Sequence, residues 1–133
     1  MTTATAALGL IHLWDVDGGF ANVSEYLDLA DGYGKMGALI AVGLMNLGIR
    51  NEIDPAKAIL EDNFKSNEIF SRKGAVIGLG LAYPGSCRED LLEMLVPLVL
   101  EVDIEVELSA MAALSLGLIF CGDCNEEASN AII

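Results

Sequence analysis

The chain has 133 residues, of which 53% are hydrophobic, and a mean hydropathy of +0.50, so its length suits one compact domain with a large apolar core. Seven basic and 20 acidic residues give a formal net charge of −13, which repels nucleic acid and anionic membranes and favours basic partners. The longest apolar stretches are shorter than the roughly 18–20 residues of a membrane span, and the N-terminus lacks the basic and small-residue features of a signal peptide.

The sequence predicts helices of two alternating kinds. The first kind is rich in small residues and apolar nearly all round, and the second is amphipathic and acidic. A helix that is apolar on every side must be buried on every side, so the first kind should be inner and the second outer, with one wet face. In chain order, inner and outer alternating, the expected ranges are about 4–13, 19–30, 34–47, 55–65, 72–83, 88–100, 107–120 and 125–133.

The apolar stretches repeat at a period of 37 residues. The repeated glycines are Gly43, Gly80 and Gly117 within the stretches and Gly48, Gly85 and Gly122 after them. A period of this size is typical of repeat proteins, whose units bury their apolar faces by stacking on one another. We therefore predict an all-α solenoid or toroid fragment of about four stacked helix pairs. It forms a single repeat domain over 1–133, with units at about 4–35, 36–71, 72–107 and a truncated 108–133.

Turn chemistry agrees with this helical interpretation. The glycines that follow the inner helices stand where a left-handed residue ends a helix. Asp54-Pro55 resembles a helix N-cap with proline at the first helical position, and Ser86 or Asn125 can cap other outer helices. A weaker α/β alternative is that residues 74–82 form a buried parallel strand, but few β-branched residues support it.

The apparent truncation of the repeat leads to a further expectation. Cut repeat faces would expose the apolar sides of the first and last inner helices, and large exposed apolar patches drive association. We expect self-association of the fragment through these faces.

The cysteines form no recognisable metal motif. Three cysteines are an odd number, which indicates free thiols in a reducing compartment. Cys121 and Cys124 form one C-x-x-C pair that Cys87 and His12 could complete, but zinc sites usually have two such pairs. Cys124 also follows Cys87 by one repeat of 37 residues, which suggests a packing role.

Two further motifs are too incomplete to indicate a site. The Asp15-Val-Asp17-Gly-Gly run lacks the glycine position and the final glutamate of a calcium loop, so capping aspartates are the stronger interpretation. Gly78-Leu-Gly80 lacks the third glycine of a dinucleotide fingerprint. The sequence predicts no enzyme, no catalytic residue, no cofactor and no metal.

Paired carboxylates recur on the outer helices. The pairs are Glu61-Asp62, Glu89-Asp90 and Glu126-Glu127. Stacking of adjacent units would bring them into one acidic band. This band either keeps an apolar repeat array soluble or forms a receptor surface that attracts a basic, partly apolar partner.

Several motifs resemble one repeat family. These are the 80–97 run GLAYPGSCREDLLEMLVP, the 13–19 run LWDVDGG, Arg50-Asn51-Glu52 and the 122–125 turn GDCN. Together they resemble the proteasome/cyclosome repeats, and they follow one another along the chain in the order typical of one branch of that family. The likeness is greatest to the toroid of the ubiquitin-receptor, non-ATPase scaffold subunits in the base of the 26S proteasome regulatory particle. A sister scaffold shares only the generic repeat.

The resemblance implies a function as well as a ring of helix pairs. It implies a non-catalytic scaffold of the cytoplasm and nucleus that contacts proteasomal ATPase subunits. It would dock ubiquitin, the ubiquitin-like domains of shuttle receptors and that of a deubiquitinase. The alternative is a purely structural repeat scaffold without ubiquitin binding.

The resemblance also indicates partner-binding residues. Glu127 occupies the first carboxylate position of the ubiquitin and shuttle site, and Glu126, Asp90 and Glu93 should extend it into an acidic lip. The deubiquitinase site resembles the Val16-Asp17 turn after Trp14. The chain departs from the family near residues 32–34. There Gly34 and Met36 stand in a linker that is usually less flexible, so the resemblance does not fix where the next helix begins.

Overall fold

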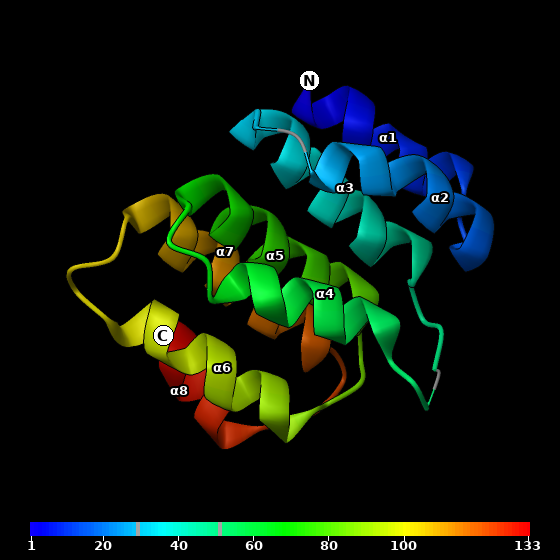
Figure 1. Ribbon diagram of the computed structural model, residues 1–133. Coiled ribbons are helices and arrows are strands. Elements are labelled where there is room, and N and C mark those ends of the chain that lie inside the picture. The colour runs from blue at the N-terminus through cyan, green and yellow to red at the C-terminus, as the bar shows by residue number, and fades with distance from the viewer. Residues whose placement is uncertain (29, 51) are drawn as a thin grey trace.

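A computed structural model describes residues 1–28, 30–50 and 52–133 of the chain, which form eight helices and no strand (Figure 1). In chain order the helices are α1 (Thr2–Ile11), α2 (Val16–Leu27), α3 (Gly32–Met45), α4 (Pro55–Phe64), α5 (Ile69–Ala82), α6 (Glu89–Leu100), α7 (Val106–Ile119) and α8 (Glu126–Ile132). The all-α prediction is confirmed. The α/β alternative is wrong, because residues 74–82 lie within α5.

The helices form two layers. The inner helices α1, α3, α5 and α7 pack side by side in chain order, and the outer helices α2, α4 and α6 cover them (Figure 1). Each of these outer helices packs mainly on the inner helix that follows it in the chain: α2 on α3, α4 on α5 and α6 on α7. The short α8 packs on α6 and α7. None of the described helices has the length and hydropathy needed to cross a membrane.

Burial follows the position of each inner helix in the array. The middle helices α3 and α5 are buried on most of their faces, as their all-round apolar composition predicts. The flanking helices α1 and α7 each keep one apolar face in solvent, with Ile11 73% and Leu114 58% exposed. The largest fully buried side chains come from both layers: Leu39, Met45, Leu60, Leu79, Leu91, Leu95, Leu108, Leu116 and Ile119.

Glycines set the distance between neighbouring inner helices. A Cβ added at Gly43 on α3 would lie 2.4 Å from the Gly78 carbonyl oxygen on α5. A Cβ at Gly80 would lie 2.8 Å from the Ser115 Cα on α7, where the Ser115 hydroxyl donates a buried hydrogen bond to the Val76 carbonyl at 2.8 Å. The backbones therefore touch at these points and leave no room for a methyl group.

The predicted turn glycines are confirmed, and the start of α2 is corrected. Gly48, Gly85 and Gly122 have φ angles of +71°, +64° and +89°. The Asp15 side chain accepts a hydrogen bond from the Gly18 N–H and caps α2, so the helix begins at Val16 rather than near residue 19. Val16 and Asp17 consequently lie in the first helical turn, not in a loop.

Two other expectations about helix ends were wrong. Gly34 and Met36 lie inside α3 rather than in a linker, because Asp31 caps that helix by accepting from the Gly34 N–H at 3.1 Å. Ser86 caps no helix, since α6 begins after Arg88. The predicted Asn125 cap of α8 is confirmed.

Two parts of the sequence predictions lie outside the described residues. Asn51 belongs to the Arg50-Asn51-Glu52 motif, and residue 29 belongs to the expected 19–30 helix.

Gly43, Gly80 and Gly117 share one position of the 37-residue repeat, and substituting them tests whether the inner helices touch at the first two. Gly43→Ala and Gly80→Ala should each lower the free energy of unfolding by about 1–3 kcal/mol, because the new methyl group overpacks a backbone contact. Gly117 occupies the same repeat position on α7, but its Cβ would meet nothing within 4 Å. Gly117→Ala should therefore raise stability by up to about 1 kcal/mol through helix propensity. Urea denaturation of the three variants measures this, and equal effects at all three sites would contradict the packing described.

Candidate functional site

A groove with a volume of about 450 Å³ lies between the end of α6 and the start of α8. Its apolar part comes from Val96, Leu100 and Ala131, and its polar rim includes Glu126 and Glu127. Leu100 is 61% exposed, so an apolar surface is open to a partner beside two carboxylates.

Local sequence chemistry places the two glutamates at this rim. Gly122 takes a left-handed conformation and ends the α7 turn, and the Asn125 side chain accepts from the Ala128 N–H at 2.9 Å. Helix α8 therefore starts at Glu126, and both glutamates stand in its first turn, where the helix dipole favours negative charge. Both side chains are exposed.

The structure places Glu93 on the groove side of α6. Glu93 precedes Val96 by three residues and Leu100 by seven, so the three share one helix face. Glu93 is exposed, and within the described part of the chain it forms no ion pair. The structure thus brings Glu93, Glu126 and Glu127 to neighbouring parts of one surface.

Asp90 has a different environment from the other predicted site residues. Its carboxylate accepts hydrogen bonds from Lys57 Nζ of α4 at 2.5 Å and from Arg88 Nη2 at 2.7 Å. These two cations, Arg88 foremost, hold the pKa of Asp90 well below its usual range. Because two cations compensate this carboxylate, Asp90 holds α6 to α4 and adds little free negative charge to the groove.

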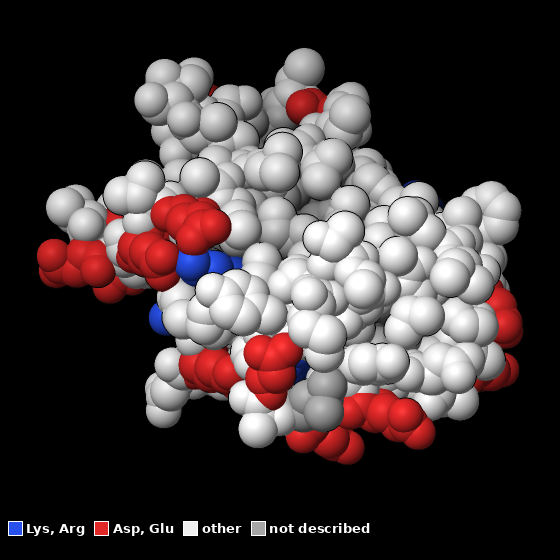
Figure 2. Space-filling view, turned by 90° about the horizontal axis from the view of Figure 1, so that it is seen from above, with Lys and Arg blue, Asp and Glu red and all other residues white. Residues whose placement is uncertain are grey.

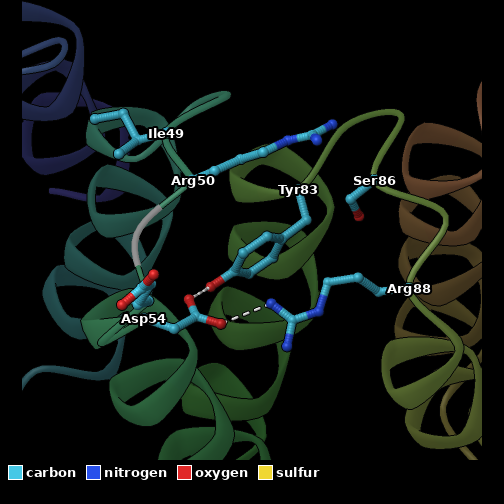
Figure 3. Close-up of a pocket in the computed structure, with 7 residues that line it drawn as sticks. Ile49, Arg50, Asp54, Tyr83, Ser86 and Arg88 are labelled. Atoms are coloured by element: carbon cyan, nitrogen blue, oxygen red, sulfur yellow. Dashed lines mark hydrogen bonds and ion pairs between the residues drawn. The ribbon is translucent and has the colours of Figure 1, made fainter.

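Arg88 links Asp90 to a second hollow, of about 370 Å³, between the loops that precede α4 and α6 (Figure 3). Its guanidinium lies over the Tyr83 ring, 4.9 Å from the centroid, and donates to Asp54 Oδ2 at 2.6 Å. The Tyr83 hydroxyl also donates to Asp54, and burial together with this bond raises the pKa of Tyr83. We call Asp54, Lys57, Tyr83, Arg88 and Asp90 the Arg88 cluster.

Sequence reasoning missed both the Arg88 cluster and the apolar part of the groove. Lys57 and Asp90 are 33 residues apart, and Arg88 and Asp54 are 34 apart, so no local pattern indicates their pairing. Val96 and Leu100 alternate with core leucines along α6, and only the position of α8 makes them part of a groove.

The predicted Val16-Asp17 site lies far from this groove. Both residues belong to α2, which Figure 1 shows at the opposite end of the molecule from α8. Asp17 is exposed, and the neighbouring Trp14 is 68% exposed while its indole N–H donates to the Leu47 carbonyl at 3.2 Å. The structure therefore separates the two predicted binding surfaces.

The cysteines and the histidine gather no metal site in the described ranges. No group of three or more His, Cys, Asp or Glu side chains there is arranged to hold a metal ion. Cys121 and Cys124 are exposed free thiols, and Cys87 is half-buried. The His12 ring contacts Asn22 at 3.1 Å and Asp15 at 3.5 Å, which accounts for both of its nitrogens.

Comparison with known proteins identifies relatives along the whole chain, although no protein-family model matches it. It is 41% identical over its full length to "26S proteasome regulatory subunit rpn-1" of Neurospora crassa and 46% identical to "26S proteasome regulatory subunit rpn1" of Schizosaccharomyces pombe. It is 37% identical over 98% of its length to "26S proteasome non-ATPase regulatory subunit 2" of Dictyostelium discoideum.

These matches cover a small part of each relative. The chain spans about 15% of the length of each of the three relatives. It is therefore homologous, over its whole length, to a segment of this 26S proteasome regulatory subunit. The resemblance to a proteasome scaffold subunit that the sequence motifs indicated is confirmed.

The Arg88 cluster makes a prediction about pH. A carboxylate with a lowered pKa stabilises the fold fully above its unfolded pKa of about 3.9, and this contribution is lost as the pH falls towards the folded value. Asp90→Asn should therefore reduce the free energy of unfolding at pH 7, and the deficit should shrink steadily below about pH 4.

Urea denaturation between pH 2 and 7 measures this difference. Glu89→Gln is the matched control, because the neighbouring Glu89 is exposed and forms no ion pair with a described residue. A deficit that stays constant with pH would show that Asp90 does not act through its charge.

Proposed function

We propose that the chain is a non-catalytic repeat segment of a proteasome scaffold subunit, and that the groove between α6 and α8 docks ubiquitin or ubiquitin-like domains. The observation that carries this proposal is an open apolar groove rimmed by Glu126 and Glu127. Homology to 26S proteasome regulatory subunits, one of them named non-ATPase, supports the setting. The proposal includes the four-unit division of 1–133, proteasomal ATPase subunits as neighbours, and action in the cytoplasm and nucleus.

The groove suits a partner with basic residues around an apolar patch. Leu100 and Val96 lose water when such a patch covers them, which stabilises the complex by about 25 cal/mol for each Å² of apolar surface buried. The glutamates at the rim attract the basic residues, raise the association rate and fix the orientation. Because exposed ion pairs contribute only about 0.2–1 kcal/mol each, the complex should be weak and reversible.

The α2 face around Val16 and Asp17 is proposed as a second docking surface, for the ubiquitin-like domain of a deubiquitinase. The exposed indole of Trp14 supplies apolar area there, and Asp17 supplies charge. Since α2 and α8 lie at opposite ends of the molecule, two partners could occupy the surfaces together (Figure 1).

Titration of isotope-labelled protein with ubiquitin tests the groove. Chemical-shift changes should concentrate at the C-terminal half of α6 and at α8. Binding should weaken as salt rises past about 0.15 M, where the Debye length is about 8 Å. If neither ubiquitin nor the ubiquitin-like domain of a shuttle receptor changes the chemical shifts, only the structural-scaffold alternative remains.

Charge reversal tests whether the carboxylates beside the groove contribute to ubiquitin binding. Glu93→Arg with Glu127→Arg should weaken ubiquitin binding about tenfold or more, because two attractive contacts become repulsive. Glu25→Arg on α2 reverses an exposed glutamate that forms no ion pair with a described residue, and should change the Kd less than about twofold. If the double variant keeps the parent's melting temperature and its affinity, the acidic rim does not bind the partner.

A further inference from the structure

The N-terminal ends of the four inner helices enclose another hollow, of about 450 Å³. Tyr33 of α3 and Phe70 of α5 line it from the same position of the 37-residue repeat, and Glu107 of α7 stands one repeat later. Thr2 of α1 lies beside them, and its hydroxyl donates to the Tyr33 carbonyl at 2.9 Å. The stacking of the repeat therefore brings these four positions together.

An aromatic pair forms the apolar wall of this hollow. The rings of Tyr33 and Phe70 pack together with their centroids 4.5 Å apart. Met36 lines the hollow next to them. Tyr33 is 57% exposed, so much of its side chain is open to a group that enters the hollow.

Two carboxylates and one ammonium line the rest of the hollow. Lys73 of α5 is only 6% exposed, and its ammonium donates to Glu105 Oε1 at 2.8 Å and to Glu107 Oε2. The other oxygens of the two glutamates accept no hydrogen bond from a residue that the structure describes. Because the two glutamates share one cation, the lining residues carry a net negative charge, which the N-terminal end of α7 stabilises.

The surface on this side of the molecule is acidic as well. Figure 2 shows acidic side chains gathered at the left edge, the side on which α7 begins in Figure 1. Only a small basic area lies among them in this view. The charge of this surface therefore complements a positively charged group.

The Arg88 cluster shows which cation fits such surroundings. There one guanidinium lies over the Tyr83 ring and pairs with the carboxylates of Asp54 and Asp90. The hollow beside Tyr33 has an aromatic ring and two carboxylates with free oxygens, but no arginine is among its described lining residues. A guanidinium suits both places, because its plane stacks on an aromatic ring while its N–H groups reach two acceptors at once.

We propose that this hollow binds an arginine side chain of a protein partner. We call it the Tyr33 pocket, and its members are Tyr33, Met36, Phe70, Lys73, Glu105 and Glu107. The stem of the arginine packs on Met36, and the guanidinium stacks on Tyr33. Its N–H groups donate to the free oxygens of Glu105 and Glu107. The Tyr33 pocket shares no residue with the α6–α8 groove, so this proposal does not depend on ubiquitin docking there.

The test titrates a short blocked peptide with one central arginine between alanines into the whole, isotope-labelled chain. Chemical-shift changes should saturate in the millimolar range and concentrate at the starts of α3, α5 and α7. The same peptide with citrulline, which keeps the shape of arginine without its charge, should bind about fivefold more weakly or not at all. A lysine peptide should bind about twofold more weakly than the arginine peptide, because an ammonium cannot stack on the ring and reach both carboxylates.

Three results of this titration would overturn the proposal. The first is equal affinity for the arginine peptide and either the citrulline or the lysine peptide. The second is shift changes spread over all the acidic helices, which would show non-specific attraction to a chain with a net charge of −13. The third is no saturation below about 10 mM.

Variants separate the Tyr33 pocket from the rest of the surface. Glu107→Gln and Tyr33→Leu should each weaken binding of the arginine peptide about threefold, because one removes a charged acceptor and the other an aromatic face. The matched control is Glu127→Gln at the α6–α8 groove, which removes the same charge elsewhere and should change the Kd less than about twofold. An equal loss in Glu127→Gln would place the peptide in the groove and overturn the proposal.

A gain of affinity provides an independent check. Lys73 competes with the peptide for the same two carboxylates, so Lys73→Met should strengthen binding of the arginine peptide about threefold. The control is Lys65→Met, which removes the same charge from an exposed ion pair with Glu61 on α4 and should change the Kd less than about twofold. Equal gains in the two variants would show that overall charge, not the Tyr33 pocket, attracts the peptide.

Folding of the variants is checked by circular dichroism and melting temperature. If Lys73→Met or Glu107→Gln unfolds the chain, Tyr33→Leu decides the question, because its side chain is mostly exposed. Parent-like affinity of folded Tyr33→Leu would overturn the proposal.

Discussion

Close contact between the backbones of successive inner helices is the constraint on which the rest of the structure depends. At Gly43 and Gly78, and again at Gly80 and Ser115, no space remains for an added side-chain carbon. Each glycine costs up to about 1 kcal/mol in helix propensity, and packing around the contact offsets this cost. The close approach buries the contact between α5 and α7 so fully that polar groups there need partners, as the Ser115 hydroxyl of α7 finds at the Val76 carbonyl of α5.

This packing decides where the ion pairs lie. Each long outer helix packs mainly on the inner helix that follows it rather than on the next outer helix. Ion pairs of the Arg88 cluster link the outer helices α4 and α6. Those of Lys73 link the inner helix α5 to the start of α7. Within the part of the chain that the structure describes, five of the seven basic residues take part in ion pairs with acidic residues. Because acidic residues outnumber basic ones 20 to 7, a large negative excess remains, and the groove rim carries part of it.

Helix α6 connects these features to function. Its first turn belongs to the Arg88 cluster, and its later turns supply Val96 and Leu100 to the groove. The ion pairs and the buried leucines hold the helix, so the proposed docking groove has a rigid support. A rigid support lowers the entropy cost of binding, which matters where individual contacts are weak.

The sequence by itself determined the helical repeat, the two kinds of helix and the left-handed glycines at 48, 85 and 122, because periodicity and turn chemistry are local properties. It also indicated Glu126 and Glu127 from their pairing and from the family resemblance. Only the tertiary structure decided that Asp90 forms an ion pair with Lys57, 33 residues away, and that Glu93 forms none with a described residue. The apolar part of the groove was equally beyond the sequence, because Val96 and Leu100 form it only with a helix that begins 26 residues after Leu100. Contacts between distant segments depend on how helices stack, and stacking depends on close approaches that no single stretch of sequence contains.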